Sequence, residues 1–154
     1  MNIRLVCVGK LKKEGLDRQS DLLVKKIGPY AKLEILEFRE GNYAASTEKG
    51  KEEEARLISR HMGKGFFDIA CDDSGEMMSS EKFAEFINKL ALHGDSNIQF
   101  IVGGPFGLHG DVLSAARKTI SFSPMVFNHM LFRIMLLEQI YRSLGILSGS
   151  PYHH

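Results

Sequence analysis

A glycine-rich segment, Gly103-Gly104-Pro105-Phe106-Gly107, is the first place in this sequence where the backbone can approach a ligand closely. Glycine lacks a Cβ and adopts backbone conformations that other residues avoid. The spacing matches neither the dinucleotide-binding fingerprint nor the P-loop, and Pro105 has no amide to donate to an anion. A pyrophosphate ligand is therefore disfavoured. Two interpretations stay open: a loop for a flat, weakly charged group such as an adenosine, and a plain strand-to-helix turn.

A second candidate is the apolar segment that runs from Ser121 to His129. Its backbone amides and carbonyls are suited to the edge of an adenine, while Met125, Val126 and Phe127 would cover the faces of the ring. Packing in the core is the alternative interpretation.

A third candidate is a set of polar residues in the last apolar stretch and at the end of the chain. A charged side chain on a buried helix needs a partner or a task. Glu138 and Arg142 have the i,i+4 spacing of a structural ion pair, and a histidine at a helix start is usually a capping or packing residue. The set comprises Asn128, His129, Arg133, Glu138, Arg142 and the terminal Pro151-Tyr152-His153-His154.

Several kinds of chemistry find no support in the sequence. Nucleophile elbow, P-loop and catalytic Cys/His patterns are absent, which argues against hydrolases and kinases. Cys7 and Cys71 lie in apolar stretches without metal-ligand spacing, so we expect buried, reduced thiols and no metal. We interpret Asp72-Asp73 as a turn rather than as part of a metal site.

Strand-like and helix-like segments alternate along the chain. Each strand-like segment is short and apolar, and the helices are delimited by capping residues and by glycine or proline. This alternation predicts a single α/β domain over residues 1–154, with a mostly parallel sheet flanked by helices. The expected strands are 2–8, 33–38, 66–71, 98–102 and 119–123, and the expected helices are 16–27, 48–61, 79–93, 111–118 and 128–147. The last of these helices is apolar around most of its circumference and is expected to be buried.

The composition, with 44% hydrophobic residues and a net charge of +1 in 154 residues, is that of a soluble globular protein. The stretch from Met130 to Leu147 contains charged residues, which argues against a membrane span, and residues 1–8 read as a strand rather than a signal peptide. A cytoplasmic location is expected. Residues 1–32 carry a formal charge of +5, residues 33–96 of −6 and residues 97–154 of +2. The basic N-terminal block would suit nucleic-acid phosphates, or it is simply a solvated helix face.

The ordered set of motifs resembles the RlmH family of bacterial ribosomal RNA methyltransferases, small members of the SPOUT class. The resemblance covers the whole chain, and the C-terminal half is its most specific part. The motifs are Leu5-Val6-Cys7-Val8-Gly9-Lys10-Leu11-Lys12, Gly28-Pro29-Tyr30, Gly75 with Ser79-Ser80-Glu81, Gly103-Gly104-Pro105-Phe106-Gly107-Leu108, Phe122-Ser123, His129, Arg133, Glu138-Gln139-Ile140-Tyr141-Arg142 and Pro151-Tyr152-His153.

The resemblance implies transfer of a methyl group from S-adenosylmethionine to N3 of a pseudouridine in large-subunit ribosomal RNA, within the assembled ribosome. The family's cofactor contacts carry over to Cys71, Gly103, Phe122, Ser123, Pro124, Met125, Val126 and Phe127. Cys71 departs from the leucine expected there, and Asp72-Asp73 replaces a more apolar pattern. The family fold also implies a C-terminal trefoil knot and a homodimer in which the tail of one subunit completes the site of the other. No membrane or DNA partner is expected.

The acceptor nitrogen carries a proton whose pKa lies well above neutral, so a base must accept the proton or positive charge must stabilise the anion. By motif position, we expect His129 or His153 to handle the proton, and Arg133 or Arg142 to orient RNA phosphate or the developing anion. Tyr152 belongs to the same tail and is counted with these catalytic candidates. Two other functions stay open: a SPOUT enzyme that acts on another RNA such as transfer RNA, and a ribosome-binding module without catalysis.

Overall fold

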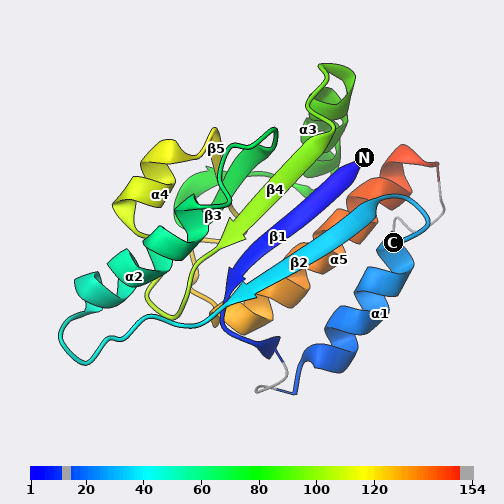
Figure 1. Ribbon diagram of the computed structural model, residues 1–154. Helices are drawn as coiled ribbons and strands as arrows, with labels where there is room; N and C mark the ends of the chain where they lie inside the picture. The colour runs from blue at the N-terminus through cyan, green and yellow to red at the C-terminus, as the bar shows by residue number, and fades with distance from the viewer. Residues whose placement is uncertain (12–14, 150–154) are drawn as a thin grey trace.

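The structure is a computed structural model that describes residues 1–11 and 15–149. Five strands form one parallel sheet in the order β2-β1-β4-β3-β5 (Figure 1). The strands are β1 (Asn2–Val8), β2 (Lys32–Phe38), β3 (Phe67–Met77), β4 (Asn97–Val102) and β5 (Lys118–Ser121). The helices are α1 (Asp17–Ile27), α2 (Thr47–Ser59), α3 (Ser80–Leu92), α4 (Gly110–Ala115) and α5 (His129–Leu147). The α/β class and the parallel sheet predicted from the sequence are confirmed.

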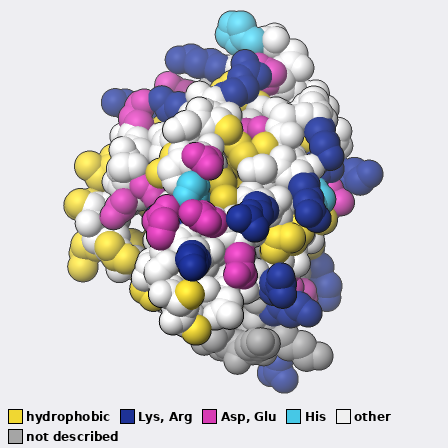
Figure 2. All heavy atoms as spheres, turned by 60° about the vertical axis from the view of Figure 1, so that its left-hand side comes forward, with side chains coloured by type: hydrophobic (Ala, Val, Ile, Leu, Met, Phe, Trp, Pro, Cys, Tyr) yellow, Lys and Arg dark blue, Asp and Glu magenta, His cyan; other side chains and the backbone are white. Residues whose placement is uncertain are grey.

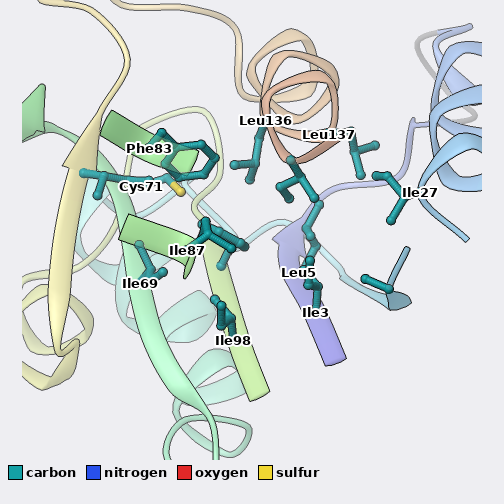
Figure 3. Packing of buried hydrophobic residues seen from close by; sticks show 14 of the residues in the cluster. Ile3, Leu5, Ile27, Ile69, Cys71, Phe83, Ile87, Ile98, Leu136 and Leu137 are labelled. Atoms are coloured by element: carbon teal, nitrogen blue, oxygen red, sulfur yellow. The ribbon is translucent and has the colours of Figure 1, made fainter. Parts of the chain in front are cut away.

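The alternation of side chains along the central strands builds two cores, one on each face of the sheet. On β1, Leu5 and Cys7 pack with α1, α3 and α5, whereas Val6 and Val8 face α2 and α4. Successive strand residues point to opposite faces, and a parallel sheet covered by helices buries both. Figure 3 shows side chains of α5 pointing toward the strands in the larger core.

Three helices begin with a residue whose side chain caps the first turn. The side chain of Ser46 accepts a hydrogen bond from the amide of Lys49 at 3.1 Å, and that of Ser79 accepts one from Lys82 at 3.3 Å. Asn128 accepts from the amide of Met130 at 2.9 Å. Each cap satisfies an amide that has no partner inside its helix, which fixes the starts of α2, α3 and α5.

Two boundaries differ from the prediction by more than two residues, the ends of β3 and of α4. Asp72-Asp73, expected in a turn, lies inside β3, which continues to Met77. The pairing with β5 shifts register between Cys71 and Glu76, because residues 72–75 bulge away and Asp72 accepts a hydrogen bond from the amide of Ser74 at 3.1 Å. The helix expected at 111–118 ends at Ala115, so that β5 starts at Lys118.

The last helix is buried on one side only. Its buried residues, such as Leu136 and Leu137, face α1, α3 and the sheet. Leu131 on another side is 44% exposed. The predicted burial of this helix is therefore confirmed for the side that faces the sheet, and part of its apolar surface is open within a single chain.

Candidate active site

A cavity of about 500 Å³ lies at the carboxyl ends of β3, β4 and β5. Its walls come from segments that are far apart in the sequence: residues 71–73, residues 102–108 and most of residues 121–127, with His129 and Phe132 from α5. Parallel sheets bring the carboxyl ends of their strands to one edge, where ligands of α/β proteins usually bind. The glycine-rich segment and the apolar segment singled out in the sequence thus face the same space.

The glycine turn, residues 103–107, needs glycine for two reasons: a Cβ would clash at Gly103 and Gly104, and the backbone at Gly107 is left-handed. A Cβ on Gly103 would lie 2.7 Å from the carbonyl carbon of Gly107, and Gly107 itself has a φ of +78°. The amide of Gly107 donates to the carbonyl of Gly104 at 3.1 Å and closes the turn. The backbone therefore forms this wall of the cavity directly, as only glycine allows.

The apolar segment keeps its shape through two serines. Ser121 Oγ donates to the carbonyl of Ser123 at 3.0 Å, and the Oγ of Ser123 accepts from the amide of Met125 at 2.9 Å. Phe122 packs against Phe132 with ring centroids 4.9 Å apart, which ties the segment to α5. Part of the segment therefore packs in the core, as the sequence allowed, and Phe122 also lines the cavity.

Most of the residues predicted to contact a cofactor line this cavity. The seven that do are Cys71, Gly103, Phe122, Ser123, Met125, Val126 and Phe127. Pro124 is not among the lining residues. Met125 and Val126 are 71% and 82% exposed, so they stand at the mouth of the cavity rather than at its base.

The two cysteines are free and buried, as the sequence predicted. Burial raises the pKa of the Cys7 thiol to about 12, and burial likewise raises the pKa of the Cys71 thiol. Both side chains are therefore neutral thiols at physiological pH, because low-dielectric surroundings disfavour the thiolate. Cys71 contributes an apolar wall to the cavity and not a nucleophile.

His129 lies in the first turn of α5 and lines the cavity with a side chain that is 12% exposed. Its Nε2 is 3.7 Å from Oε1 of Glu40, which follows β2. A Cβ on Gly9, after β1, would lie 2.1 Å from Cε of Met130 and 3.2 Å from Nε2 of His129, so this glycine makes room for the first turn of α5. Sequence reasoning missed Glu40, because nothing local links it to a residue 89 positions later.

Arg133 is completely buried, and its guanidinium forms hydrogen bonds with β1, β2 and the residue that follows β1. It donates to Oε1 of Glu37 at 2.6 Å and to the carbonyls of Val8 and Gly9 at 3.2 and 2.9 Å. Its Nε has no hydrogen-bond partner among residues 1–11 and 15–149. These contacts tie the start of α5 to the ends of β1 and β2, and they leave the guanidinium closed to an RNA phosphate in this chain.

Arg142 lies far from the cavity along α5. It donates to Oε1 of Glu138 at 2.7 Å, which is the structural i,i+4 pair that the sequence left open. Thirteen residues separate it from His129, a rise of about 20 Å along a helix. The structure of one chain therefore does not bring Arg142 to the cavity. Tyr152 and His153, the other catalytic candidates, lie outside the described residues.

The face of the molecule drawn in Figure 2 is mixed in charge rather than uniformly basic. Figure 2 shows acidic side chains near the centre of the view, Lys and Arg mainly toward one side, and hydrophobic side chains gathered at the opposite edge. In the described part of the chain, no helix is long and apolar enough to cross a membrane. The same residues contain no group of three or more His, Cys, Asp or Glu side chains suited to a metal ion.

The chain is similar to known proteins over its whole length. The family described as "Predicted SPOUT methyltransferase" matches residues 1–153. Proteins named ribosomal RNA large subunit methyltransferase H from Clostridium kluyveri and Alkaliphilus oremlandii are each 42% identical over 158 aligned residues, and one from Clostridium novyi is 43% identical. Each alignment covers 99% of this chain and 99% of the relative.

A solved structure gives the same fold at low sequence identity. The crystal structure of a probable methyltransferase from Bordetella pertussis Tohama I superposes with a TM-score of 0.57 and 10% identity, over 92% of this chain and 95% of the other. Together with the full-length family match, the parallel sheet and the cavity at its carboxyl edge, these similarities show that the chain belongs to the SPOUT methyltransferase family.

Proposed function

We propose that this protein transfers a methyl group from S-adenosylmethionine to N3 of a pseudouridine in large-subunit ribosomal RNA, within the assembled ribosome. The observation that carries the proposal is the cavity, which gathers seven of the eight residues that the family resemblance assigns to the cofactor. The names of the full-length relatives support the RNA substrate.

The cavity fits the methyl donor in size and in chemistry. Its volume of about 500 Å³ falls within the usual range for small-molecule sites. The backbone of Gly103 and of residues 122–127 would hydrogen-bond the edge of the adenine, and Met125, Val126 and Phe127 would contact its faces. The donor supplies an activated methyl group on a sulfonium, so the protein has chiefly to align donor and acceptor.

His129 is our candidate for the group that takes the acceptor proton. As the bond from the methyl carbon to sulfur breaks and the bond to N3 forms, the N3 proton passes to the imidazole, and the sulfur leaves as a neutral thioether. The position of His129 on the cavity wall beside Glu40 supports this role. His153 and Tyr152 of the chain end are the alternative candidates, and Arg142 is proposed to orient an RNA phosphate or the anion.

Arg133 is proposed to hold His129 in position rather than to contact the substrate. Its bonds to Glu37, Val8 and Gly9 hold the first turn of α5, and with it His129, against the ends of β1 and β2. Buried charge-assisted hydrogen bonds of this kind fix geometry well.

The working form is proposed to be a cytoplasmic homodimer that binds the ribosome, with a trefoil knot at the C-terminal end of a single domain over residues 1–154. The exposed apolar side chains of Met125, Val126 and Leu131 support a second copy as cover for this region. A partner's tail would then bring its own Tyr152 and His153 to the cavity.

The test is transfer of labelled methyl from S-adenosylmethionine to assembled ribosomes, free ribosomal RNA and transfer RNA. Ribosomes that lack the pseudouridine are the matched control. We expect label only in ribosomes that contain the pseudouridine. Label in transfer RNA would show that the proposed ribosomal substrate is wrong. The absence of both label and donor binding would favour a ribosome-binding module without catalysis.

A further inference from the structure

A carboxyl group is buried directly beneath the glycine turn. Glu54 lies on α2 and is 2% exposed. If Gly104 carried a Cβ, that atom would lie 2.6 Å from Oε1 and 2.9 Å from Oε2 of Glu54. The carboxyl group therefore fills the space that a side chain at position 104 would need, and it supports the cavity wall from behind.

The same carboxyl group anchors the segment that follows β2. Oε1 of Glu54 accepts hydrogen bonds from the amide of Gly41, at 3.0 Å, and from the hydroxyl of Tyr43. The Tyr43 ring then packs edge-on against Phe106 of the glycine turn, with centroids 4.7 Å apart. A Cβ on Gly50 would lie 2.0 Å from the Tyr43 ring, so α2 is shaped to seat that ring. Three separate segments thus meet at Glu54.

Burial of the Glu54 carboxyl group disfavours folding, so side-chain packing alone does not account for this arrangement. Among the described residues, no lysine or arginine forms a salt bridge with Glu54. Burial of a carboxyl group disfavours folding unless hydrogen bonds compensate. Burial and the hydrogen bond to Glu54 raise the pKa of Tyr43 well above its usual value, so the phenol stays a donor at neutral pH. An apolar residue at position 54 would fill the space but would leave the Gly41 amide and the Tyr43 hydroxyl without this acceptor.

We infer that Glu54 is a positioning residue for the methyl-donor cavity, holding the glycine turn through Gly104 and, by way of Tyr43, through Phe106. The inference rests on the proposed function, since it takes the cavity as the donor site. Glu54 lies behind the wall, so it acts on donor binding and leaves RNA binding and proton transfer to other residues. Loss of the contact raises the KM for S-adenosylmethionine more than it lowers kcat, and the KM for ribosomes stays constant.

The first experiment compares Glu54→Gln with a matched control, Glu53→Gln. Glu53 is the neighbouring acid on α2 and accepts from the amide of Asn42 at 3.1 Å on the exposed side of the same segment. Calorimetric titration of S-adenosylmethionine should give a Kd raised about fivefold for Glu54→Gln, as for loss of part of a charged hydrogen bond, and a Kd close to wild type for Glu53→Gln. Equal Kd values for the two variants would overturn the inference, as would a loss confined to kcat.

A double-mutant cycle tests the contact with Gly104 itself. Gly104→Ala places a Cβ against the carboxyl group, and Glu54→Ala removes that group, so the double variant relieves the clash. The effects of the two substitutions on the donor Kd should be clearly less than additive. Additive effects would contradict the proposed contact.

Hydrogen exchange without donor separates this inference from the proposed function. The amides of Gly41 and Gly107 should exchange faster in Glu54→Gln than in Glu53→Gln, because both belong to the segments that Glu54 holds. Equal exchange at both amides would overturn the positioning role whether or not the protein binds the donor. Failure of the wild-type protein to bind S-adenosylmethionine would instead contradict the proposed function.

Discussion

The two ends of the parallel strands differ in how they satisfy their polar groups. We call the side where the strands begin the amino edge of the sheet and the side where they end the carboxyl edge. At the amino edge, Gln99 is fully buried and donates to Oδ1 of Asp68 at 2.8 Å and to the carbonyl of His61 at 3.0 Å. The other oxygen of Asp68 accepts from the amide of Gly63 at 2.5 Å. At the carboxyl edge, glycine backbone and half-exposed apolar side chains surround an open cavity. The amino edge closes its hydrogen bonds within the chain, whereas the carboxyl edge closes them only at the ends of β1 and β2, around Arg133, and leaves an open cavity at β3, β4 and β5.

We therefore propose that the amino edge serves stability and that the carboxyl edge at β3, β4 and β5 serves binding. A closed network of buried polar groups stabilises a fold when every member has a partner. Backbone without side chains and exposed apolar surface contribute less to the fold and suit a ligand. Substitutions at the two edges should therefore affect different measurements.

The largest effect is expected from His129→Ala at the carboxyl edge. Removal of the proposed proton acceptor should lower kcat for ribosome methylation at least a hundredfold, the usual contribution of general-base catalysis. The Kd for the donor should change little, and the melting temperature should show that the protein is folded. A kcat within threefold of wild type would exclude His129 as the base and favour His153.

The next effect in size belongs to the amino edge. Gln99→Ala removes the donor to Oδ1 of Asp68 and to the His61 carbonyl, while Oδ2 of Asp68 keeps its bond from the amide of Gly63, and should lower the free energy of unfolding by about 2 kcal/mol. Urea denaturation measures this, and calorimetry of the same variant should give an unchanged donor Kd. A weaker donor affinity at unchanged stability would contradict the division between the two edges.

A smaller effect is expected for Gly103→Ala, which would place a Cβ 2.7 Å from the backbone of Gly107. The turn must shift, and the Kd for S-adenosylmethionine should rise about tenfold, which corresponds to about 1.4 kcal/mol. Gly110→Ala is the control, since a Cβ there meets nothing within 4 Å and its φ is not positive. If both variants bound the donor equally well, the glycine turn would not form part of the binding site.

The smallest effect is a change in pH dependence at the amino edge. Burial raises the pKa of Asp68 above its ordinary value. The folded state then holds its proton to higher pH than the unfolded state, so this group makes stability fall as pH rises from the unfolded pKa through the folded one. Asp68→Asn should remove that part of the slope between pH 4 and neutrality in urea titrations. An identical slope in variant and wild type would show that Asp68 titrates as an exposed carboxyl group.

The sequence was most informative where the signal is local. The alternation in residues 2–8 and the almost continuous apolar run of residues 98–102 predicted two central strands, and the capping residues Ser46 and Ser79 marked helix starts. The glycines of residues 103–107 predicted a close backbone approach. Each of these features depends on a few neighbouring residues, which is why pattern alone was sufficient.

The contacts that the sequence did not reveal join residues far apart in the chain. Arg133 pairs with Glu37, 96 positions earlier, and no local pattern connects them. Glu54 ends an acidic run that looks solvated, although Ala55 and Ile58 place it beside the buried stripe of α2. The bulge after Cys71 depends on how β3 pairs with β5, which only the folded sheet determines.

The central claim is that the carboxyl edge of the sheet holds the methyl donor, and a crystal structure of the protein grown with S-adenosylmethionine tests it most directly. We expect the adenosine between the glycine turn and residues 122–127, with the methyl group directed toward the side of the cavity that His129 lines. A donor bound elsewhere on the protein, or an empty cavity at saturating donor, would contradict the account.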